Sequence, residues 1–154
     1  MTLFRAAAED DLLGIVRLQA EDTLPPGREL TDAPVADCYA RAFAAMAADP
    51  NQLLVAAEDA GELVGTLQLT FIPGLAFRGA WRGQIESVRI AAHRRNQGLG
   101  EAMIRWAVDR CRERGCRMVQ LTSSNGRGDA HRFYERLGFS RSHTGFKLNL
   151  DGKA

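Results

Sequence analysis

The chain has 154 residues, of which 45% are hydrophobic and 25% charged, as expected for one soluble globular domain. These values exclude a disordered or collagen-like chain. The longest unbroken apolar run, residues 42–48, is far shorter than the roughly 20 residues that a membrane-spanning helix needs. The early residues are acidic, unlike a secretory signal. Three cysteines without CxxC spacing indicate reduced thiols. We therefore expect a cytoplasmic protein with no membrane partner.

The net charge is only +1, but the charges are unevenly distributed along the chain. Residues 1–62 contain 12 acidic and 4 basic residues, whereas residues 63–154 contain 7 acidic and 16 basic ones. Nearly all bases are arginines, whose planar guanidinium groups suit phosphate better than lysine does. This asymmetry favours an anionic ligand for the second half and a cationic one for the first, with accidental segregation on a solvated surface as the alternative. The sequence pI of 7.8 argues against a nucleic-acid partner, which usually requires a value above ~9.

Apolar periodicity and turn residues predict an alternation of strands and helices. Two early helices precede a hairpin, and strand–helix units follow it, which implies a mixed sheet with helices on both faces. A long loop after the hairpin is of the kind that tends to carry function. The expected elements are a strand at 2–5, helices at 10–21 and 33–48, strands at 52–58 and 62–71, a loop at 72–83, a strand at 84–90, a helix at 98–114, a strand at 117–122, a helix at 129–137 and two strands within 139–150.

The most informative segment is Arg-Arg-Asn-Gln-Gly-Leu-Gly at residues 94–100, between a predicted strand and a predicted helix. A helix N-terminus has unpaired backbone N–H groups and partial positive charge, so it accepts phosphate oxygens. Glycines at 98 and 100 allow an anion to approach the backbone closely. A Walker A loop is excluded because Glu101 replaces its lysine, and a dinucleotide fingerprint is excluded because Met103 replaces its third glycine. An anion-binding loop of another kind is therefore indicated.

Residues 95–100 match the Arg/Gln-x-x-Gly-x-Gly/Ala pyrophosphate motif of the GNAT superfamily of acyl-CoA-dependent N-acyltransferases, which this sequence resembles. The strand at 85–90 precedes the motif at the usual distance. A second signature of the family follows in Asn125 and in residues 129–139. One departure from the family pattern is a short insertion-like segment at 125–128. The resemblance covers residues 84–140 in motifs and the preceding residues in element order only.

The resemblance implies roles for residues in both motifs. Backbone amides of the 97–100 segment would hold the pyrophosphate of acetyl-CoA, and the strand backbone at 88–90 would pair with the pantetheine arm. Tyr134 would protonate the departing thiolate, while residues of the second signature would line the other wall. The implied cofactor-binding residues are Val88, Arg89, Ile90, Arg95, Asn96, Gln97, Gly98, Leu99, Gly100, Asn125, Ala130 and Phe133.

Glu86 is the candidate general base. Strict alternation along the strand at 84–90 places Glu86 on the same face as Val88 and Ile90, where apolar neighbours would raise its pKa. A surface carboxylate paired with an arginine is the alternative reading. Tyr134 also has an alternative, as a core tyrosine of its helix, and Asn125 has one as a turn residue. Three scattered histidines offer no metal-ligand spacing, so no metal is expected.

We therefore expect an α/β fold with a GNAT-like, mostly antiparallel sheet of six to seven strands flanked by about four helices, in a single domain spanning residues 1–154. The expected activity is N-acetyl transfer from acetyl-CoA to a primary amine of a small molecule, by direct attack in a ternary complex. The alternatives are a non-catalytic acyl-CoA-binding or sensing module and a protein N-terminal or lysine acetyltransferase. A homodimer is an assembly that the sequence leaves open.

Overall fold

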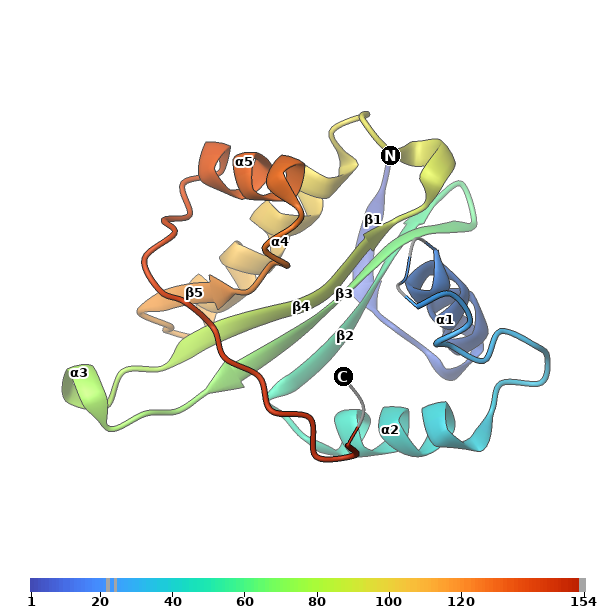
Figure 1. The fold of residues 1–154 in the computed structure, drawn as a ribbon, viewed down its shortest axis with the longest axis horizontal. Helices are drawn as coiled ribbons and strands as arrows, with labels where there is room; N and C mark the ends of the chain where they lie inside the picture. Colours follow the sequence, from blue (N-terminus) through green and yellow to red (C-terminus); the bar gives the residue numbers. More distant parts are fainter. Residues whose placement is uncertain (22, 24, 153–154) are drawn as a thin grey trace. The chain divides into compact units, whose positions relative to one another are not determined.

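The computed structural model describes residues 1–21, 23 and 25–152, which fall into two compact units that meet between Leu121 and Thr122. The first unit contains all strands found among these residues, and the second contains the last helix (Figure 1). Short 3₁₀ turns at Glu9–Asp11 and Ala92–Arg94 accompany the main elements. These are β1 (Leu3–Ala6), α1 (Leu12–Ala20), α2 (Asp37–Ala48), β2 (Gln52–Asp59), β3 (Glu62–Ile72), α3 (Ala76–Gly79), β4 (Arg82–Ile90), α4 (Leu99–Glu113), β5 (Met118–Leu121) and α5 (Gly128–Arg136).

The strands of the first unit form one sheet in the order β1-β2-β3-β4-β5. The first three pairings are antiparallel, and β4 pairs with β5 in parallel. The turn between β2 and β3 has Ala60 and Gly61 at positive φ, as a tight hairpin requires. A parallel pairing needs a crossover connection, and α4 provides it between β4 and β5.

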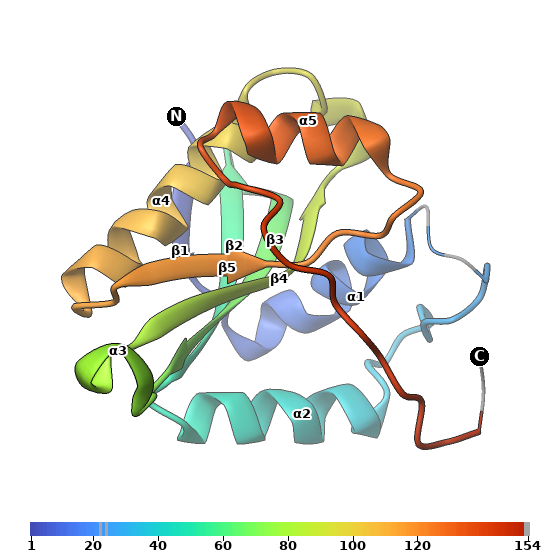
Figure 2. The same cartoon turned by 60° about the vertical axis from the view of Figure 1, so that its left-hand side comes forward.

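Helices cover both faces of this sheet (Figures 1 and 2). Successive strand residues point to opposite faces of a sheet. Because Leu54 and Val55 are both buried, both faces are covered. On the face of Leu54, the core includes Leu12 and Ile15 of α1 together with side chains of α2. We call this the α1/α2 face. On the α4 face, the ring of Trp106 in α4 lies 6.0 Å from that of Phe4 in β1.

The α/β class and the mixed sheet are confirmed, but the expected six to seven strands are wrong. The described residues form five strands and five α-helices, of which α3 has only four residues. No strand forms between residues 139 and 150, where two were expected. Phe146, Leu148 and Leu150 alternate as in a strand, but all three side chains are exposed. The described residues of the second unit contain no strand, and one extended segment by itself has no partner for its backbone groups.

A close approach between β4 and α4 positions the site. A methyl group added to Gly83 of β4 would overlap the sulfur of Cys111 in α4. Cys111 itself is only 1% exposed, and burial raises the pKa of its thiol to about 12. Because glycine has no side chain, Gly83 allows α4 to pack closely on the sheet. It thereby also fixes the position of the loop that precedes α4.

We expect Gly83→Ala to lower the free energy of unfolding by about 1–3 kcal/mol, because the added methyl group overpacks this contact. Denaturant unfolding measures the loss. Gly126→Ala is the matched control, since a side chain there meets nothing within 4 Å. The double variant Gly83→Ala/Cys111→Ala should recover part of the loss, and no recovery would show that the Cys111 contact is not the cause.

Candidate functional site

The N-terminus of α4 has the features of an anion-binding site. Gly98 precedes the helix with φ +79°, a left-handed conformation that favours glycine, and Asn96 also has positive φ. A side chain at Gly98 would meet no atom within 4 Å, so this end of the helix faces open space. The N–H groups of the first helical turn have no acceptors within the helix. The open space and these donors fit an anionic group such as the pyrophosphate of acetyl-CoA.

The loop before α4 is held to the rest of the first unit by acidic residues. Arg94 donates to Asp59 at 2.7 Å, and this hydrogen bond lowers the pKa of the Asp59 carboxyl below its usual value. Arg95 donates to the carbonyl of Ile90 at 3.2 Å and lies 3.5 Å from a Glu21 carboxylate oxygen. Of the two arginines expected to add charge beside the anion, Arg94 is thus offset by Asp59 and acts mainly to fix the loop.

β4 runs on beyond its pairing with β5. The register of the two strands ends at Ile85 and Leu121, while β4 continues from Glu86 to Ile90. Residues 88–90, the segment expected to pair with the pantetheine arm, lie in this continuation and lead directly into the loop before α4. In the first unit, the strand segment at 88–90 is therefore followed along the chain by the open N-terminus of α4.

Glu86 does not share a face with Val88 and Ile90, so the expectation from strict alternation is wrong. Glu86 pairs with Gln68, whereas Ile90 pairs with Gly65. One residue more lies between the two positions on β4 than on β3, which is a β-bulge, and Ser87 within it has φ +54°. Glu86 is exposed, on the α1/α2 face, and is not enclosed among apolar side chains.

Polar side chains cross the α1/α2 face in a row that sequence reasoning missed. Gln52, Thr70, Gln84 and Gln120 are direct cross-strand neighbours on β2, β3, β4 and β5, and we call them the polar row. Thr70 donates to Gln52 at 2.9 Å, and Gln120 donates to Gln84 at 2.6 Å. Sheet faces under helices are usually apolar, so a polar row beside Glu86 suits a polar ligand. The polar alternation along each strand was the available signal.

A second carboxylate near this face also escaped sequence reasoning. Burial acts to raise the pKa of Glu29, but hydrogen bonds from the Tyr39 hydroxyl at 2.8 Å and from Arg28 at 2.7 Å outweigh it and leave the pKa lowered. Arg89 of β4 contributes to this lowering through its charge. The hydrogen bonds from Tyr39 and Arg28 therefore favour the ionised form of Glu29.

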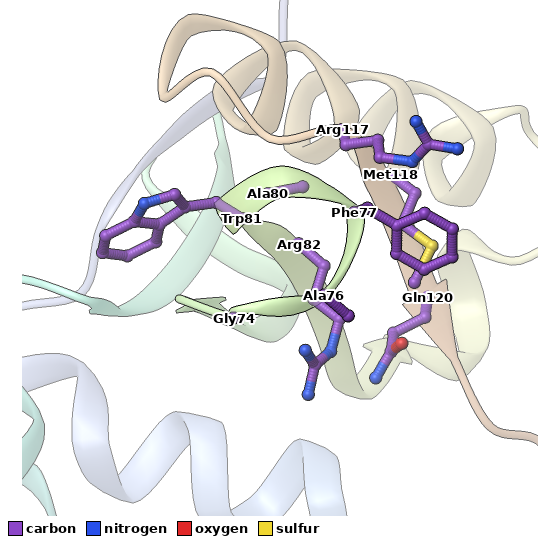
Figure 3. Close-up of a pocket in the computed structure, with 9 residues that line it drawn as sticks. All are labelled: Gly74, Ala76, Phe77, Ala80, Trp81, Arg82, Arg117, Met118 and Gln120. Atoms are coloured by element: carbon purple, nitrogen blue, oxygen red, sulfur yellow. The ribbon is translucent and has the colours of Figure 1, made fainter.

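A pocket of about 290 Å³ lies at the other end of β4, where the β3–β4 connection meets the start of β5. Figure 3 shows Arg82 and Gln120 projecting to the same side, whereas Trp81 points away from them. Within the connection, Phe77 and Arg78 have positive φ, which is uncommon for residues with side chains. The sequence predicted a functional loop at 72–83, which includes part of this region. It did not predict the pairing of Arg82 with β5.

The second unit carries the remaining predicted residues. Ala130, Phe133 and Tyr134 lie on α5, and the Tyr134 ring packs edge-on against Phe133 at 5.1 Å and against Phe139 at 5.9 Å. Asn125 lies in the turn before α5, in which the Arg127 N–H donates to the Ser124 carbonyl at 3.0 Å. The roles assigned to these residues stay predictions.

The described residues offer neither a metal centre nor a membrane-spanning helix. They contain no group of three or more His, Cys, Asp or Glu side chains placed to hold a metal ion. No helix in this part of the chain is both long and apolar enough to cross a membrane.

Residues 15–139 match the model of the Acetyltransferase (GNAT) family. The chain belongs to this family. It is therefore an acetyl-CoA-dependent N-acetyltransferase, and the resemblance drawn from the two sequence motifs is confirmed.

Two curated relatives are named as N-acetyltransferases, and a solved structure with another description shares the fold. The aminoalkylphosphonate N-acetyltransferase of Salmonella typhimurium is 35% identical over 108 residues, which cover 70% of each chain. The glucosamine 6-phosphate N-acetyltransferase of Trypanosoma brucei brucei is 34% identical over 58% of this chain and 59% of the relative. Among solved structures, a transcriptional regulator from Bacillus halodurans C-125 superposes with a TM-score of 0.93 at 43% identity, covering 97% of this chain and all of the other.

We expect Gly98→Glu to weaken CoA binding by at least tenfold, because a carboxylate would enter the space where the pyrophosphate is expected and repel it. Isothermal calorimetry measures the change. Gly98→Ala carries the same backbone strain without charge, and Gly98→Gln has the same size without charge, so both should bind CoA more tightly than Gly98→Glu. Equal affinity in Gly98→Glu and wild type would contradict the pyrophosphate assignment.

Proposed function

We propose that the enzyme transfers the acetyl group of acetyl-CoA to a primary amine of a small molecule, by direct attack within a ternary complex. The observation that carries this proposal is the open N-terminus of α4 at Gly98, reached directly from the β4 segment beyond Glu86. The curated relatives named above act on an aminoalkylphosphonate and on glucosamine 6-phosphate, which supports a small amine as acceptor.

In this proposal residues 1–154 act as one acetyltransferase domain. The family match runs from residue 15 to residue 139 and so covers most of the first compact unit and about half of the second. The donor would be held by backbone groups of Gln97, Gly98, Leu99 and Gly100 at the pyrophosphate and of Val88, Arg89 and Ile90 along the pantetheine. Arg95 and Asn96 would shape the loop, while Asn125, Ala130 and Phe133 would line the opposite wall.

Acetyl-CoA supplies an activated thioester, and the chain supplies proton transfer and positioning. Glu86 would accept a proton from the attacking ammonium, directly or through a water molecule, since it is exposed on the face that carries the polar row. The amine nitrogen then forms a bond to the carbonyl carbon while the C–S bond breaks. A backbone N–H of the β4 segment would stabilise charge on the carbonyl oxygen. Tyr134 would give its proton to the departing thiolate, and the second proton of the attacking nitrogen would restore the Tyr134 hydroxyl through solvent.

A screen of amines by thiol release from acetyl-CoA tests the proposal. Small primary amines should give turnover well above peptides that carry a free N-terminus or a lysine. A preference for peptides would instead support the protein N-terminal or lysine acetyltransferase. We also propose a cytoplasmic location, supported by three cysteines that form no disulfide.

We expect Glu86→Gln to lower kcat at pH 7 by at least tenfold, because a positioned base contributes about 10²–10⁴ and the amide cannot accept the proton. The dissociation constant of CoA should stay nearly unchanged. Glu113→Gln, at an exposed glutamate of α4 paired with Arg110, is the control and should keep full activity. A loss below threefold in Glu86→Gln would assign the base to another group.

We expect Tyr134→Phe to lower kcat roughly 10–10³-fold, since it removes the proton donor while keeping the ring packed against Phe133 and Phe139. KM for acetyl-CoA should change much less, and thermal unfolding should show a stability close to that of wild type. Full activity of the variant between pH 6 and 9 would exclude Tyr134 as the acid. A large rise in KM at constant kcat would make it a binding residue.

A further inference from the structure

The loop before α4 is held by a hydrogen-bond acceptor from a distant part of the chain. Ala92–Arg94 forms the 3₁₀ turn that leads from β4 into the 95–98 segment. The first N–H groups of a helical turn have no acceptor within it, and a polar side chain at the N-cap usually supplies one. Here the N-cap residue is Ala91, whose methyl group cannot accept a hydrogen bond. The turn therefore requires an acceptor from elsewhere.

Glu21 supplies this acceptor from 71 positions earlier in the chain. The Ala92 N–H donates to a carboxylate oxygen of Glu21 at 3.2 Å, and Arg95 lies 3.5 Å from the same oxygen. The backbone of Glu21 is itself anchored, because Glu21 is the C-cap residue of α1 and its N–H donates to the Leu18 carbonyl at 3.3 Å. The end of α1 thus holds the turn that precedes the N-terminus of α4.

The hydrogen bond from Ala92 matters more than the ion pair with Arg95. The side chains of Glu21 and Arg95 are 37% and 40% exposed, and an ion pair at such exposure contributes little to stability. Its distance of 3.5 Å is also long for a hydrogen bond. The Ala92 N–H, in contrast, belongs to the backbone, so its acceptor fixes where the turn lies. Glu21 therefore acts by placing an oxygen atom at the right reach, and its negative charge is secondary.

The same turn is tied to the strands by other contacts. The Ala91 N–H donates to the Val64 carbonyl of β3 at 2.9 Å, and Arg94 donates to Asp59 at the end of β2 at 2.7 Å. Glu21 adds the attachment to α1. Only residues 95–98 separate the turn from the first residue of α4, so a shift of the turn also moves the backbone at Gly98. A binding site needs such supporting contacts to keep its own groups in place.

We propose that Glu21 is a positioning residue for the donor site: it holds the turn at Ala92 so that the backbone N–H groups at the start of α4 are in place for the pyrophosphate of acetyl-CoA. Glu21 acts through Ala92 and touches no reacting atom. A carboxylate thus favours the binding of an anion, although its charge alone would oppose it. This inference rests on the proposed donor site at Gly98.

Three substitutions of Glu21 separate the reach of the acceptor from its charge. Glu21→Gln keeps an oxygen at the same distance without the charge, Glu21→Asp keeps the charge on a shorter side chain, and Glu21→Ala removes both. We expect Glu21→Gln to bind CoA within about twofold of wild type, and Glu21→Asp and Glu21→Ala to bind it about three- to tenfold more weakly, the effect of one hydrogen bond. Isothermal calorimetry, run well below the unfolding temperature of every variant, measures the Kd. Glu113→Ala, at an exposed glutamate of α4 paired with Arg110, is the control and should bind CoA as wild type does.

Two fragments of CoA show where Glu21 acts. Phosphoadenosine diphosphate contains the pyrophosphate of CoA, whereas pantetheine lacks it. We expect Glu21→Ala to weaken binding of the first fragment by the same factor as binding of CoA, and to leave binding of pantetheine unchanged. An equal loss for both fragments would indicate a general effect on the fold and would overturn the proposal.

The variants also give outcomes that contradict the proposal directly. Wild-type affinity for CoA in Glu21→Ala would show that the donor site does not need Glu21. Equal losses in Glu21→Gln and Glu21→Ala, with Glu21→Asp unaffected, would assign the effect to charge and overturn the role of the Ala92 hydrogen bond. Unchanged CoA binding in Gly98→Glu would count instead against the proposed donor site, whatever the result at Glu21.

Discussion

The β-bulge in β4 is the constraint on which the site depends. Without the extra residue at Ser87, Glu86 and Ile90 would share one face of the strand. With it, the first half of β4 presents Arg82, Gln84 and Glu86 to the α1/α2 face, while Ile90 turns toward the α4 face. The strand thus directs polar and charged side chains to one face and leads its backbone into the loop before α4. Bulges are frequent next to active sites because they redirect side chains in this way.

Part of the uneven charge of the chain is neutralised by ion pairs within the first unit. Acidic residues from the first half pair with bases of the second around the loop before α4: Asp59 binds Arg94, and His93 lies 3.0 Å from Glu62. The sequence interpretation was that the acidic first half attracts a cationic ligand. These ion pairs account for part of that acidic charge without a ligand.

The parts of the fold that depend on local pattern were predictable from the sequence. The predicted helix at 98–114 agrees closely with α4, and the helical spacing of Leu99, Met103 and Ala107 matches its buried side. The parts that depend on strand register were not predictable. The position of Glu86 depends on a bulge that is defined only by the partner strand. Arg82 and Met118 are distant in sequence and become neighbours through the parallel pairing of β4 with β5.

The expected strands after residue 138 illustrate the same limit, since alternation in one segment does not supply the neighbour that a strand needs. Phe146, Leu148 and Leu150 alternate as in a strand, yet such a pattern says nothing about pairing. In the second unit the helical signature around Tyr134 was the stronger guide, because a helix satisfies its own backbone groups.

The contact between Gly83 and Cys111 has a chemical consequence for how this enzyme is handled. Cys38 is exposed, whereas the thiol of Cys111 is buried against the sheet and its pKa is raised to about 12. Thiolate is the form that reacts with disulfide and maleimide reagents. A reagent that counts released CoA will therefore also count Cys38 at once, but will reach Cys111 only in molecules whose helix has separated from the sheet. Slow labelling at Cys111 thus reports the opening of the same contact that holds the start of α4 in place.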